Sequence, residues 1–327
     1  MRDAILELLK EHKGDFVSGQ MMSDTCNVSR TAIWKHIEVL RRYGYKIESF
    51  TKKGYRLVSE PDLVSPLEVE PFLKTKTFGR RYEYVDSLAS TNSKGRELAL
   101  EGAPEGTLIV AEEQNAGRGR INRGWYSPYG KGLWFSLILR PSFLPVEASK
   151  CTLMAAVALI KAFRKLGLNT AGIKWPNDIL VGQRKLVGIL TEMSGTIEEI
   201  SYIVMGIGIN ISTTADEMPE YLQGVATSLA IEGIKVDRRK AFAVILKSLE
   251  EQYEKVLKEG FDSTLEEWKE FSITLNQDVL VKAPGESYNG RAIDIDRDGN
   301  LLVERPNGQV ERIMAGDISI RPAKIGG

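Results

Sequence analysis

Residues 116–132, AGRGRINRGWYSPYGKG, hold three arginines and five glycines in one short stretch. Arg118, Arg120 and Arg123 lie within six positions of one another, with no acidic residue in the stretch. Guanidinium groups are forked donors that match phosphate and carboxylate oxygens, and glycines let backbone N–H groups approach a ligand closely. We interpret this arginine loop (residues 116–132) as a lid that is disordered when empty and folds over an anionic ligand. A mobile surface loop without a ligand is the alternative, but it leaves the neighbouring tryptophans unexplained.

The common nucleotide-binding motifs are absent from the sequence. It has no G-x-x-x-x-G-K-[ST], which excludes a P-loop, and neither GRGRIN nor GIGINI completes the G-x-G-x-x-G of a dinucleotide site. The only histidines are His12 and His36, so a Ser–His–acid triad has little support. With only Cys26 and Cys151 beside them, no structural zinc site is expected. Any catalysis should therefore use a nucleophile that the substrates supply.

The elements that must position the arginine loop belong to a mixed region from Leu67 to about Phe271. Its strand-like segments are rich in Ile, Val and Leu. They are GTLIVAEEQ (106–114), GLWFSLILRP (132–141), IKWPNDILV (173–181), RKLVGILTEMS (184–194) and EISYIVMGIGINIS (199–212). Residues 152–167 are apolar on nearly every side and predict a buried helix, and two later helices are predicted at 238–260 and 262–272. Hairpins mixed with helices favour an α+β sheet domain over a doubly wound one.

The first 60 residues predict a winged helix-turn-helix. After a short amphipathic helix come two helices joined at Asn27, a residue type that tolerates left-handed backbone angles. Ser18 and Ser29 are the expected N-caps, and Gly44 lies just past the end of the second helix. The segment YKIESFTKKGYRLV (45–58) then predicts two strands around a basic tip, which would form the wing.

Charge and helix faces suggest what this module binds. From Arg30 to Arg56 there are eight basic residues and only two acidic ones, an excess that a polyanion attracts. The second helix should turn Ile33, Ile37 and Leu40 inward and a mostly basic face outward, as a recognition helix does. We therefore predict DNA binding by Ser29, Arg30, Thr31, Lys35, Arg42, Lys52 and Lys53. A solvated basic face, or a structural or protein-interaction module, is the alternative, and Trp34 is expected to pack beside the core.

Prolines and turn motifs in the sequence predict where the domain boundaries lie. The segment SEPDLVSP (59–66) carries two prolines, so the prediction is a DNA-binding domain at 1–60, a linker at 61–66 and a catalytic domain at 67–271. Residues 272–327 form the last domain, where short strands and the turns GESYNG, RDGN and PNGQ predict an SH3-like β-barrel. No run approaches the roughly 20 apolar residues of a membrane span, and no signal peptide is visible. Two distant cysteines fit a reducing cytoplasm.

The arginine loop resembles the G-R-G-R-x-x-R-x-W-x-S-P-x-G signature of biotin protein ligases at every fixed position. Further motifs occur in the family's order, STN (90–92) before the arginine loop, and KWPNDIL (174–180), KLVGIL (185–190) and GIGIN (206–210) after it. With the N-terminal module, the chain resembles the bifunctional type, a biotin ligase and biotin operon repressor in one polypeptide. The resemblance implies that the α+β middle domain is a class II synthetase-like mixed sheet with helices.

That resemblance also implies a two-step reaction and a regulatory role. Biotin and ATP would give biotinyl-5′-AMP and pyrophosphate, with Mg²⁺ expected beside the ATP. Biotin would then pass to a lysine of a biotin carboxyl carrier domain, in acetyl-CoA carboxylase or a similar protein. Biotinyl-5′-AMP would act as corepressor, favouring a homodimer on operator DNA that represses genes of biotin synthesis or transport. No membrane partner is expected.

The family's residues map onto this sequence as follows. Those expected at biotin are Ser90, Thr91, Asn92, Gln114, Arg118, Gly119, Arg120, Lys185 and Gly188. Those expected at ATP or the adenylate are Arg118, Arg120, Arg123, Trp125, Lys174, Asn177 and Asn210. The expected catalytic residues are Lys185, Arg118, Lys174 and Asp178, of which the last would orient the attacking amine or help to hold magnesium. The loop 211–225 should cover adenine, and Trp134 is either an apolar wall or a core residue.

Two other functions fit part of the pattern. A DNA-binding sensor could hold a ligand in its middle domain without catalysis, but the intact GRGR with Lys174 and Lys185 speaks against it. A lipoate–protein ligase would have a similar catalytic fold. The arginine loop and the N-terminal wing favour biotin over lipoate.

Overall fold

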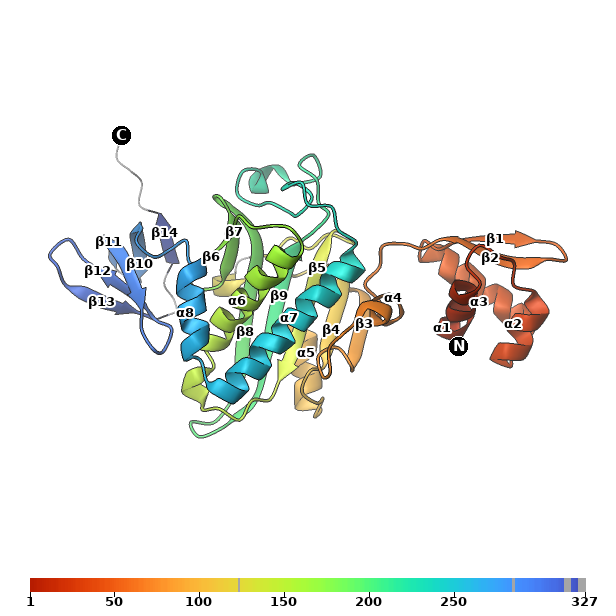
Figure 1. The fold of residues 1–327 in the computed structure, drawn as a ribbon, viewed down its shortest axis with the longest axis horizontal. Coiled ribbons are helices and arrows are strands. Elements are labelled where there is room, and N and C mark those ends of the chain that lie inside the picture. Colours follow the sequence, from red (N-terminus) through yellow and green to blue (C-terminus); the bar gives the residue numbers. More distant parts are fainter. Residues whose placement is uncertain (123, 284–285, 315–318, 323–327) are drawn as a thin grey trace. The chain divides into compact units, whose positions relative to one another are not determined.

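Figure 1 shows a computed structural model of the chain, which describes all residues except 123, 284–285, 315–318 and 323–327. The chain divides into two units, Met1–Leu63 and Val64–Gly327. In the part of the chain that is described, no helix is both long enough and apolar enough to span a bilayer.

The first unit consists of helices followed by a two-stranded hairpin. Its elements are α1 (Arg2–Glu11), α2 (Gly19–Cys26), α3 (Arg30–Arg42), β1 (Lys46–Phe50) and β2 (Gly54–Ser59). The predicted caps are present: Ser18 accepts a hydrogen bond from the backbone N–H of Met21, and Ser29 accepts one from that of Ala32. Asn27 has φ 51° and ψ 50°, a left-handed conformation that reverses the chain between α2 and α3. The predicted helix-turn-helix with its hairpin is confirmed.

Helix α3 has the two faces that its sequence predicts. Ile33 and Ile37 are fully buried, whereas Lys35 and Arg42 are exposed. The expectation for Trp34 was wrong, because this side chain is 53% exposed. Position 34 lies about 100° around the helix from Ile33, beyond the buried stripe. Trp34 therefore belongs to the outward face of α3.

A seven-stranded sheet forms the centre of the second unit, in the order β3-β4-β5-β9-β8-β7-β6. Its strands are β3 (Tyr82–Leu88), β4 (Leu108–Gln114), β5 (Gly132–Leu139), β6 (Ala171–Lys174), β7 (Asp178–Val181), β8 (Arg184–Gly195) and β9 (Ile200–Asn210). β3 and β4 run parallel, and the other neighbouring strands pair antiparallel. The mixed sheet that the sequence predicted is confirmed.

Two parts of this unit differ from the sequence-based assignment. Strand β3 and helix α5 (Thr91–Leu100) lie in a stretch where no element was predicted, because β3 has no fully buried residue and so carries no clear apolar signal. The predicted strand at 173–181 is in fact two short strands, β6 and β7, with Lys174 paired to Asp178 across the turn. Apolar residues on both sides of this turn concealed the reversal.

Helices cover both faces of the sheet (Figure 1). One face carries α5, and the other carries the helices α6 (Lys150–Lys165), α7 (Arg238–Glu259) and α8 (Asp262–Phe271). Side chains along β4 alternate between the two: Leu108 and Val110 join the large core under α6 and α7, whereas Ile109 packs with Leu98 of α5. Because successive side chains of a strand point to opposite faces, the strands alternate between the two cores.

Short helical turns connect these elements. They are α4 (Pro66–Val69), η1 (Glu70–Phe72), η2 (Arg120–Asn122), η3 (Pro145–Glu147) and η4 (Glu220–Leu222). Val64, which falls within the predicted linker at 61–66, already lies in the large core of the second unit. The structure thus anchors the chain to this unit from Val64 onward.

The C-terminal strands form a five-stranded antiparallel sheet in the order β13-β12-β11-β10-β14. They are β10 (Asp278–Ala283), β11 (Glu286–Ile295), β12 (Leu301–Glu304), β13 (Val310–Ile313) and β14 (Ser319–Pro322). Val281 and Leu301 join the same core as α6 and α8. The indole N–H of Trp175 donates to the carbonyl of Gly299 at 3.1 Å, which fastens this sheet to the turn between β6 and β7.

Candidate functional site

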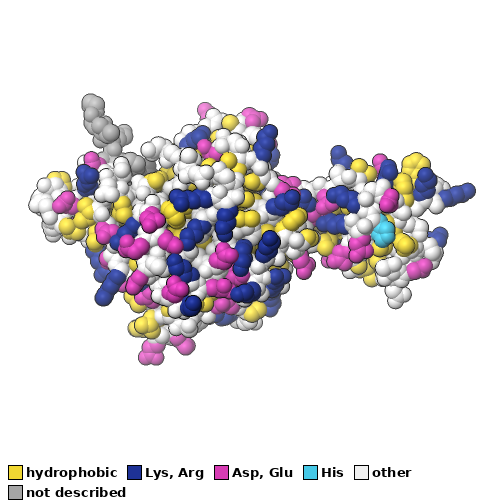
Figure 2. All heavy atoms as spheres, in the orientation of Figure 1, with side chains coloured by type: hydrophobic (Ala, Val, Ile, Leu, Met, Phe, Trp, Pro, Cys, Tyr) yellow, Lys and Arg dark blue, Asp and Glu magenta, His cyan; other side chains and the backbone are white. Residues whose placement is uncertain are grey.

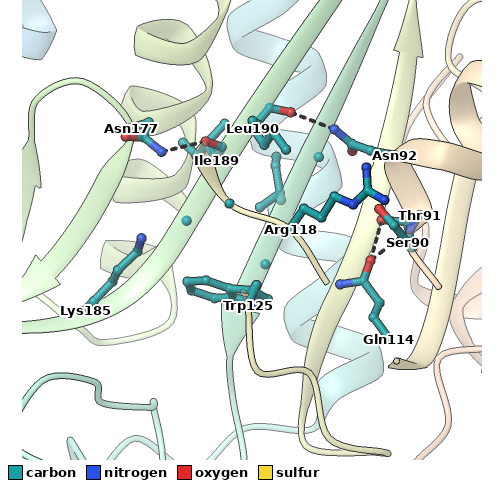
Figure 3. Close-up of a pocket in the computed structure, with 15 residues that line it drawn as sticks. Ser90, Thr91, Asn92, Gln114, Arg118, Trp125, Asn177, Lys185, Ile189 and Leu190 are labelled. Atoms are coloured by element: carbon teal, nitrogen blue, oxygen red, sulfur yellow. Dashed lines mark hydrogen bonds between the residues drawn. The ribbon is translucent and has the colours of Figure 1, made fainter. Parts of the chain in front are cut away.

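A pocket opens where the first turn of α5 meets β8 and β9 (Figure 3). Segments that are far apart in the sequence meet there: the start of α5, the end of β4, the arginine loop, the turn before β7, and both central strands. Its lining consists of Ser90, Thr91, Asn92, Gln114, Arg118, Gly119, Trp125, Asn177, Lys185, Gly188, Ile189, Leu190, Gly206, Ile207 and Gly208. The fold therefore brings all the recognised motifs of the middle domain to one place.

Three glycines make room for this pocket. Val204 of β9 packs against α5, so Gly206 and Gly208 face the same side of the sheet, and Gly188 of β8 pairs with Gly208. A Cβ at Gly206 would lie 2.0 Å from Asn92 Oδ1, and one at Gly208 would lie 2.3 Å from the indole nitrogen of Trp125. We call these three residues the glycine floor. Any side chain there would collide with Asn92 or Trp125 and displace these residues of the pocket wall.

One end of the pocket is rich in hydroxyl and amide side chains. Ser90 is the N-cap residue of α5, and Thr91 and Asn92 form its first turn. The backbone N–H of Thr91 donates to Gln114 Oε1 at 2.8 Å, and Gln114 Nε2 donates to Ser127 Oγ at 3.0 Å. Thr91 and Asn92 are 4% and 5% exposed, so their polar atoms have little access to bulk water. This end can recognise a small polar group by hydrogen bonds.

The arginine loop lies at the edge of the pocket. Arg118 pairs with Gly124 in an isolated β-bridge, and the N–H of Trp125 donates to the carbonyl of Gly117 at 2.9 Å. In Figure 3 the side chain of Arg118 runs across the pocket toward Ser90 and Thr91. The loop therefore already contributes a guanidinium group and an indole ring to the site.

The other end of the pocket is basic. Lys185 Nζ lies 2.7 Å from Asp178 Oδ1 and 5.0 Å from the centre of the Trp125 ring. Asn177 Nδ2 donates to the carbonyl of Ile189 at 2.9 Å, and Arg120 Nη1 donates to Asn177 Oδ1 at 3.2 Å. Figure 3 shows Lys185 and Asn177 on the side of the pocket away from Gln114. An anionic group at this end would meet Lys185.

Most of the predicted site residues line the pocket, and a few do not. Arg120, Lys174 and Asp178 stand behind the lining, with Arg120 and Asp178 held by the contacts just described. Asn210 also lies outside the lining, where its Nδ2 donates to the carbonyl of Thr227 at 2.9 Å. Arg123 lies outside the residues that the structure describes.

Trp134 is a core residue. It is fully buried, its indole N–H donates to the carbonyl of Pro128 at 3.2 Å, and it does not line the pocket. Its ring meets that of Trp125 edge to face, with 6.4 Å between centroids. Of the two roles left open by the sequence, the structure supports the core role, in which Trp134 backs the Trp125 ring.

Five lining residues were not predicted. They are Ile189, Leu190, Gly206, Ile207 and Gly208. The two glycines carried a signal, because glycines two apart in an apolar strand leave a gap on one face of the sheet. Ile189, Leu190 and Ile207 have no such signal, since any strand of this sheet would carry similar residues.

The loop that the sequence assigned to adenine, 211–225, is tied to the basic end. The N–H of Lys185 donates to the carbonyl of Val225 at 2.8 Å. Glu217 belongs to the same loop, and its Oε1 lies 2.5 Å from Lys131 Nζ. This ion pair joins the end of the arginine loop to the loop 211–225. The hydrogen bond from Lys131 is the main cause that lowers the pKa of Glu217 to about 2. The Lys131–Glu217 pair therefore links the two loops.

A second candidate site is the basic surface of the first unit. Arg30, Thr31, Lys35, Arg42, Lys52 and Lys53 are all exposed, as is Ser29, whose hydroxyl is engaged as the α3 cap. Figure 2 shows basic side chains around the hairpin end of this unit. Arg30 donates to Gln20 Oε1 at 2.6 Å, which places it at the junction of α2 and α3. The residues predicted for DNA thus share accessible positions on α3 and the hairpin.

Comparison with protein families matches three segments of the chain. Residues 84–210 match the biotin/lipoate A/B protein ligase family, residues 2–56 an HTH domain, and residues 274–321 the biotin protein ligase C-terminal domain. The first match contains every segment that lines the pocket. The second spans α1 to β2.

Known proteins are similar along nearly the whole chain. The bifunctional ligase/repressor BirA of Bacillus spizizenii is 39% identical over 98% of both chains, and that of Escherichia coli is 33% identical over 95% of both. Among solved structures, the biotin protein ligase of Aquifex aeolicus in complex with biotin and ATP has a TM-score of 0.64 at 25% identity, and covers 75% of this chain and 100% of its own. The motifs, the pocket and these similarities agree: the chain belongs to the biotin protein ligase family, in its bifunctional ligase/repressor form.

Proposed function

We propose that this chain activates biotin with ATP in the pocket on the α5 face and transfers it to a lysine of a biotin carboxyl carrier domain. The observation that carries the proposal is the pocket itself, which joins an end rich in hydroxyl and amide groups to a basic end at Lys185 over a glycine floor. Biotin has the matching form, a polar ureido ring at one end of a chain and a carboxylate at the other. The residue roles below follow from that match.

The polar end would hold the ureido ring. Ser90, Thr91, Asn92 and Gln114 offer hydroxyl and amide groups. Thr91 and Gln114 are already hydrogen-bonded to each other, and Asn92 is held by Leu190 and Glu192. Preorganised partners cost little free energy to order when the ligand binds. Over the glycine floor, the Trp125 ring lies close to Gly188 and Gly208, and it would form an apolar wall for the valeryl chain.

The basic end would bring two anions together. A carboxylate oxygen of biotin attacks the α-phosphorus of ATP, the bond to the β-phosphate oxygen breaks, and pyrophosphate leaves. Lys185 would neutralise both the carboxylate and the phosphate, and Arg118 and Arg120 would add donors from the arginine loop. Holding the reactants in line contributes as much as the charges do. We assign Lys174, Asn177 and Asn210 to the nucleotide side as supporting residues.

The second step uses the carrier lysine as nucleophile. Its neutral amine attacks the acyl carbon of biotinyl-5′-AMP, the bond to the phosphate oxygen breaks, AMP leaves, and the nitrogen loses a proton. Asp178 lies 2.7 Å from Lys185 Nζ, so its carboxylate stands at the place where an incoming amine would need orientation. We assign it that role.

Magnesium would accompany ATP without an all-protein site. Among the described residues, no three His, Cys, Asp or Glu side chains are grouped as metal ligands. Mg²⁺ usually keeps several waters and binds through substrate phosphates with one or two carboxylates. The single carboxylate of Asp178 near the basic end fits that arrangement.

The ligase reaction is tested with the full chain, biotin, ATP and a biotin carrier domain. Mass analysis should show that one lysine of the carrier gains one biotinyl group, and omission of biotin or ATP should abolish the gain. Biotin-dependent exchange of pyrophosphate into ATP isolates the first step and separates an enzyme from a ligand sensor. The same assay with lipoic acid in place of biotin tests the alternative function, a lipoate–protein ligase. A carrier that stays unmodified with biotin but accepts lipoate would overturn the proposal.

We further propose that biotinyl-5′-AMP acts as a corepressor. Bound adenylate would favour a homodimer whose two first units bind a palindromic operator of biotin synthesis or transport genes. The exposed basic residues of α3 and the hairpin support DNA binding. Operator binding measured with and without biotin and ATP tests the coupling, and binding that is indifferent to both would disprove it.

A further inference from the structure

Behind the polar end of the pocket, hydrogen bonds fix the orientation of the Asn92 amide. Asn92 Nδ2 lies 3.1 Å from the carbonyl oxygen of Leu190 and 2.8 Å from Glu192 Oε2. Glu192 is itself paired with Arg96 at 2.6 Å. Both partners only accept hydrogen bonds, so the NH₂ group must point toward them. The amide oxygen must therefore point the other way.

That oxygen determines where the proton of Ser136 goes. Ser136 Oγ lies 2.6 Å from Asn92 Oδ1 and 2.8 Å from Thr91 Oγ1. The amide oxygen can only accept, so the single hydroxyl proton of Ser136 is committed to it. Ser136 is fully buried on β5, outside the pocket lining, so water cannot take over either bond. Toward Thr91, Ser136 has only a lone pair left.

The other neighbour of the Thr91 hydroxyl is also an acceptor. The backbone N–H of Thr91 donates to Gln114 Oε1, so the oxygen of that amide is the atom that faces Thr91. Thr91 Oγ1 lies 3.2 Å from the same oxygen. Both neighbours thus offer lone pairs, and the proton of Thr91 stays on the protein side. A lone pair of Thr91 Oγ1 is therefore what this side chain offers to a ligand in the pocket.

We propose that Ser136, held by Asn92 and Glu192, is a positioning residue that makes Thr91 a fixed hydrogen-bond acceptor and thereby selects a ligand ring with an N–H donor. This inference rests on the proposed function, since the ureido ring of biotin carries such donors. The dithiolane ring of lipoate carries none and would leave the buried oxygen of Thr91 without a partner. Sites built to hydrogen-bond a donor reject analogues that lack it far more strongly than apolar pockets reject a change of size.

The test compares ligands that differ in one donor. Biotin is set against two cyclic carbamate analogues, each with one ring N–H replaced by oxygen, and affinities for the full-length chain are measured by titration calorimetry. The wild-type chain should prefer biotin by at least about 100-fold over the analogue that lacks the donor at Thr91. In Ser136→Ala the Thr91 hydroxyl keeps only Gln114 Oε1, at 3.2 Å, as an acceptor on the protein side, so its proton is held less firmly and this preference should fall to roughly 10-fold. The KM for biotin should rise, while kcat at saturating biotin and the KM for ATP stay within about twofold.

Two further variants keep the test decisive. Glu192→Ala removes a partly exposed acceptor but leaves the Leu190 carbonyl, so it should shift the preference in the same direction by less. Ser248→Ala deletes another buried hydroxyl, which lies on α7 and accepts from Lys165 of α6, and should leave the preference unchanged. If Ser136→Ala fails to fold, the Glu192→Ala result decides alone.

The failures can be told apart. A wild-type chain that binds biotin and both carbamates equally overturns this inference and leaves the proposed function standing. An unchanged preference in folded Ser136→Ala does the same. A wild-type chain that binds none of these ligands overturns the proposed function, and this inference with it.

Discussion

Lys185 is the cation at the basic end of the pocket, where we propose that the biotin carboxylate meets ATP. Replacing it with alanine removes a cation from the point where two anions must meet, so adenylate formation should slow by about 100- to 1000-fold. Biotin affinity should change less, because the ureido end is untouched. Biotin-dependent pyrophosphate exchange measures the rate. Lys161→Ala, which breaks a pair with Glu267 outside the pocket, is the matched control. Equal rates in the two variants would contradict the role of Lys185.

Gly208 tests the glycine floor. A Cβ there would lie 2.3 Å from the Trp125 indole nitrogen, so Gly208→Ala must displace Trp125 from the pocket wall. We expect at least a tenfold loss of adenylate affinity, about 1.4 kcal/mol, with the melting temperature little changed. Gly19→Ala in the first unit, where a Cβ meets only Tyr55 at 4.0 Å, serves as control. Calorimetry showing undiminished affinity in Gly208→Ala would mean that the floor is not where the ligand lies.

At the scale of single residues, the sequence predicted residues that line the pocket better than the residues that hold them in position. Arg118, Gln114 and Lys185 belong to polar motifs and were predicted to bind ligand, and the structure places all three on one pocket. Ser136 was not predicted, because a lone serine in the apolar strand GLWFSLIL shows its purpose only when Thr91 and Asn92 are seen beside it. Such a partnership across the sheet has no trace in linear spacing.

Among the elements, the arginine loop is the one whose movement should control the intermediate. In Arg118→Ala, the adenylate should dissociate about 100-fold faster, since a charge-assisted contact of the lid is lost, while folding is unaffected. Stopped-flow release of a fluorescent adenylate measures the off-rate. Arg164→Ala on α6, whose guanidinium lies over Phe271, is the control. An off-rate unchanged from wild type would show that the loop is not the lid of the intermediate.

The ion pair that links the arginine loop to the loop at 211–225 can be tested by measuring the pKa of Glu217. The pKa of Glu217 is lowered from the usual 4.5 to about 2, first by the hydrogen bond from Lys131 and then by the N–H of Thr214. Because the pKa of Glu217 is lower in the folded protein, this pair stabilises the folded state fully above pH 4.5. That stabilisation is lost as the pH falls through about 2. Lys131→Ala should raise the pKa of Glu217 toward 4.5, as followed by carboxyl NMR. A value that stays near 2 would mean that Lys131 is not the cause, and Glu267 gives an internal reference.

Elements with a strong apolar period were predictable, and those without one were not. The segment 152–167 is apolar all round and gave α6, whereas Tyr82–Leu88 is half-exposed along its length and was missed. The run at 173–181 read as one strand, since a turn at Trp175 and Pro176 leaves the apolar pattern on either side intact. Placing STN at the start of α5 required the parallel pairing of β3 with β4, a long-range contact that local patterns do not encode.

For the whole molecule, the expected linkage is between ligand and DNA. Lys35→Ala on the exposed face of α3 should weaken operator binding and reduce the slope of log K against log salt by about one, as expected for one lost phosphate contact. Ligase activity should be unaffected, because this residue belongs to the other unit. Fluorescence anisotropy over a salt series provides the measurement. A slope that does not change would place Lys35 outside the DNA contact.

The central claim is that a single pocket holds biotin by its polar end while its carboxylate meets ATP at Lys185. Native mass spectrometry of the full chain, incubated with biotin and ATP in the absence of any carrier domain, tests this most directly. The account predicts one biotinyl-5′-AMP retained per chain, with an equal amount of pyrophosphate released. Folded protein that binds biotin and ATP yet accumulates neither adenylate nor pyrophosphate would contradict it.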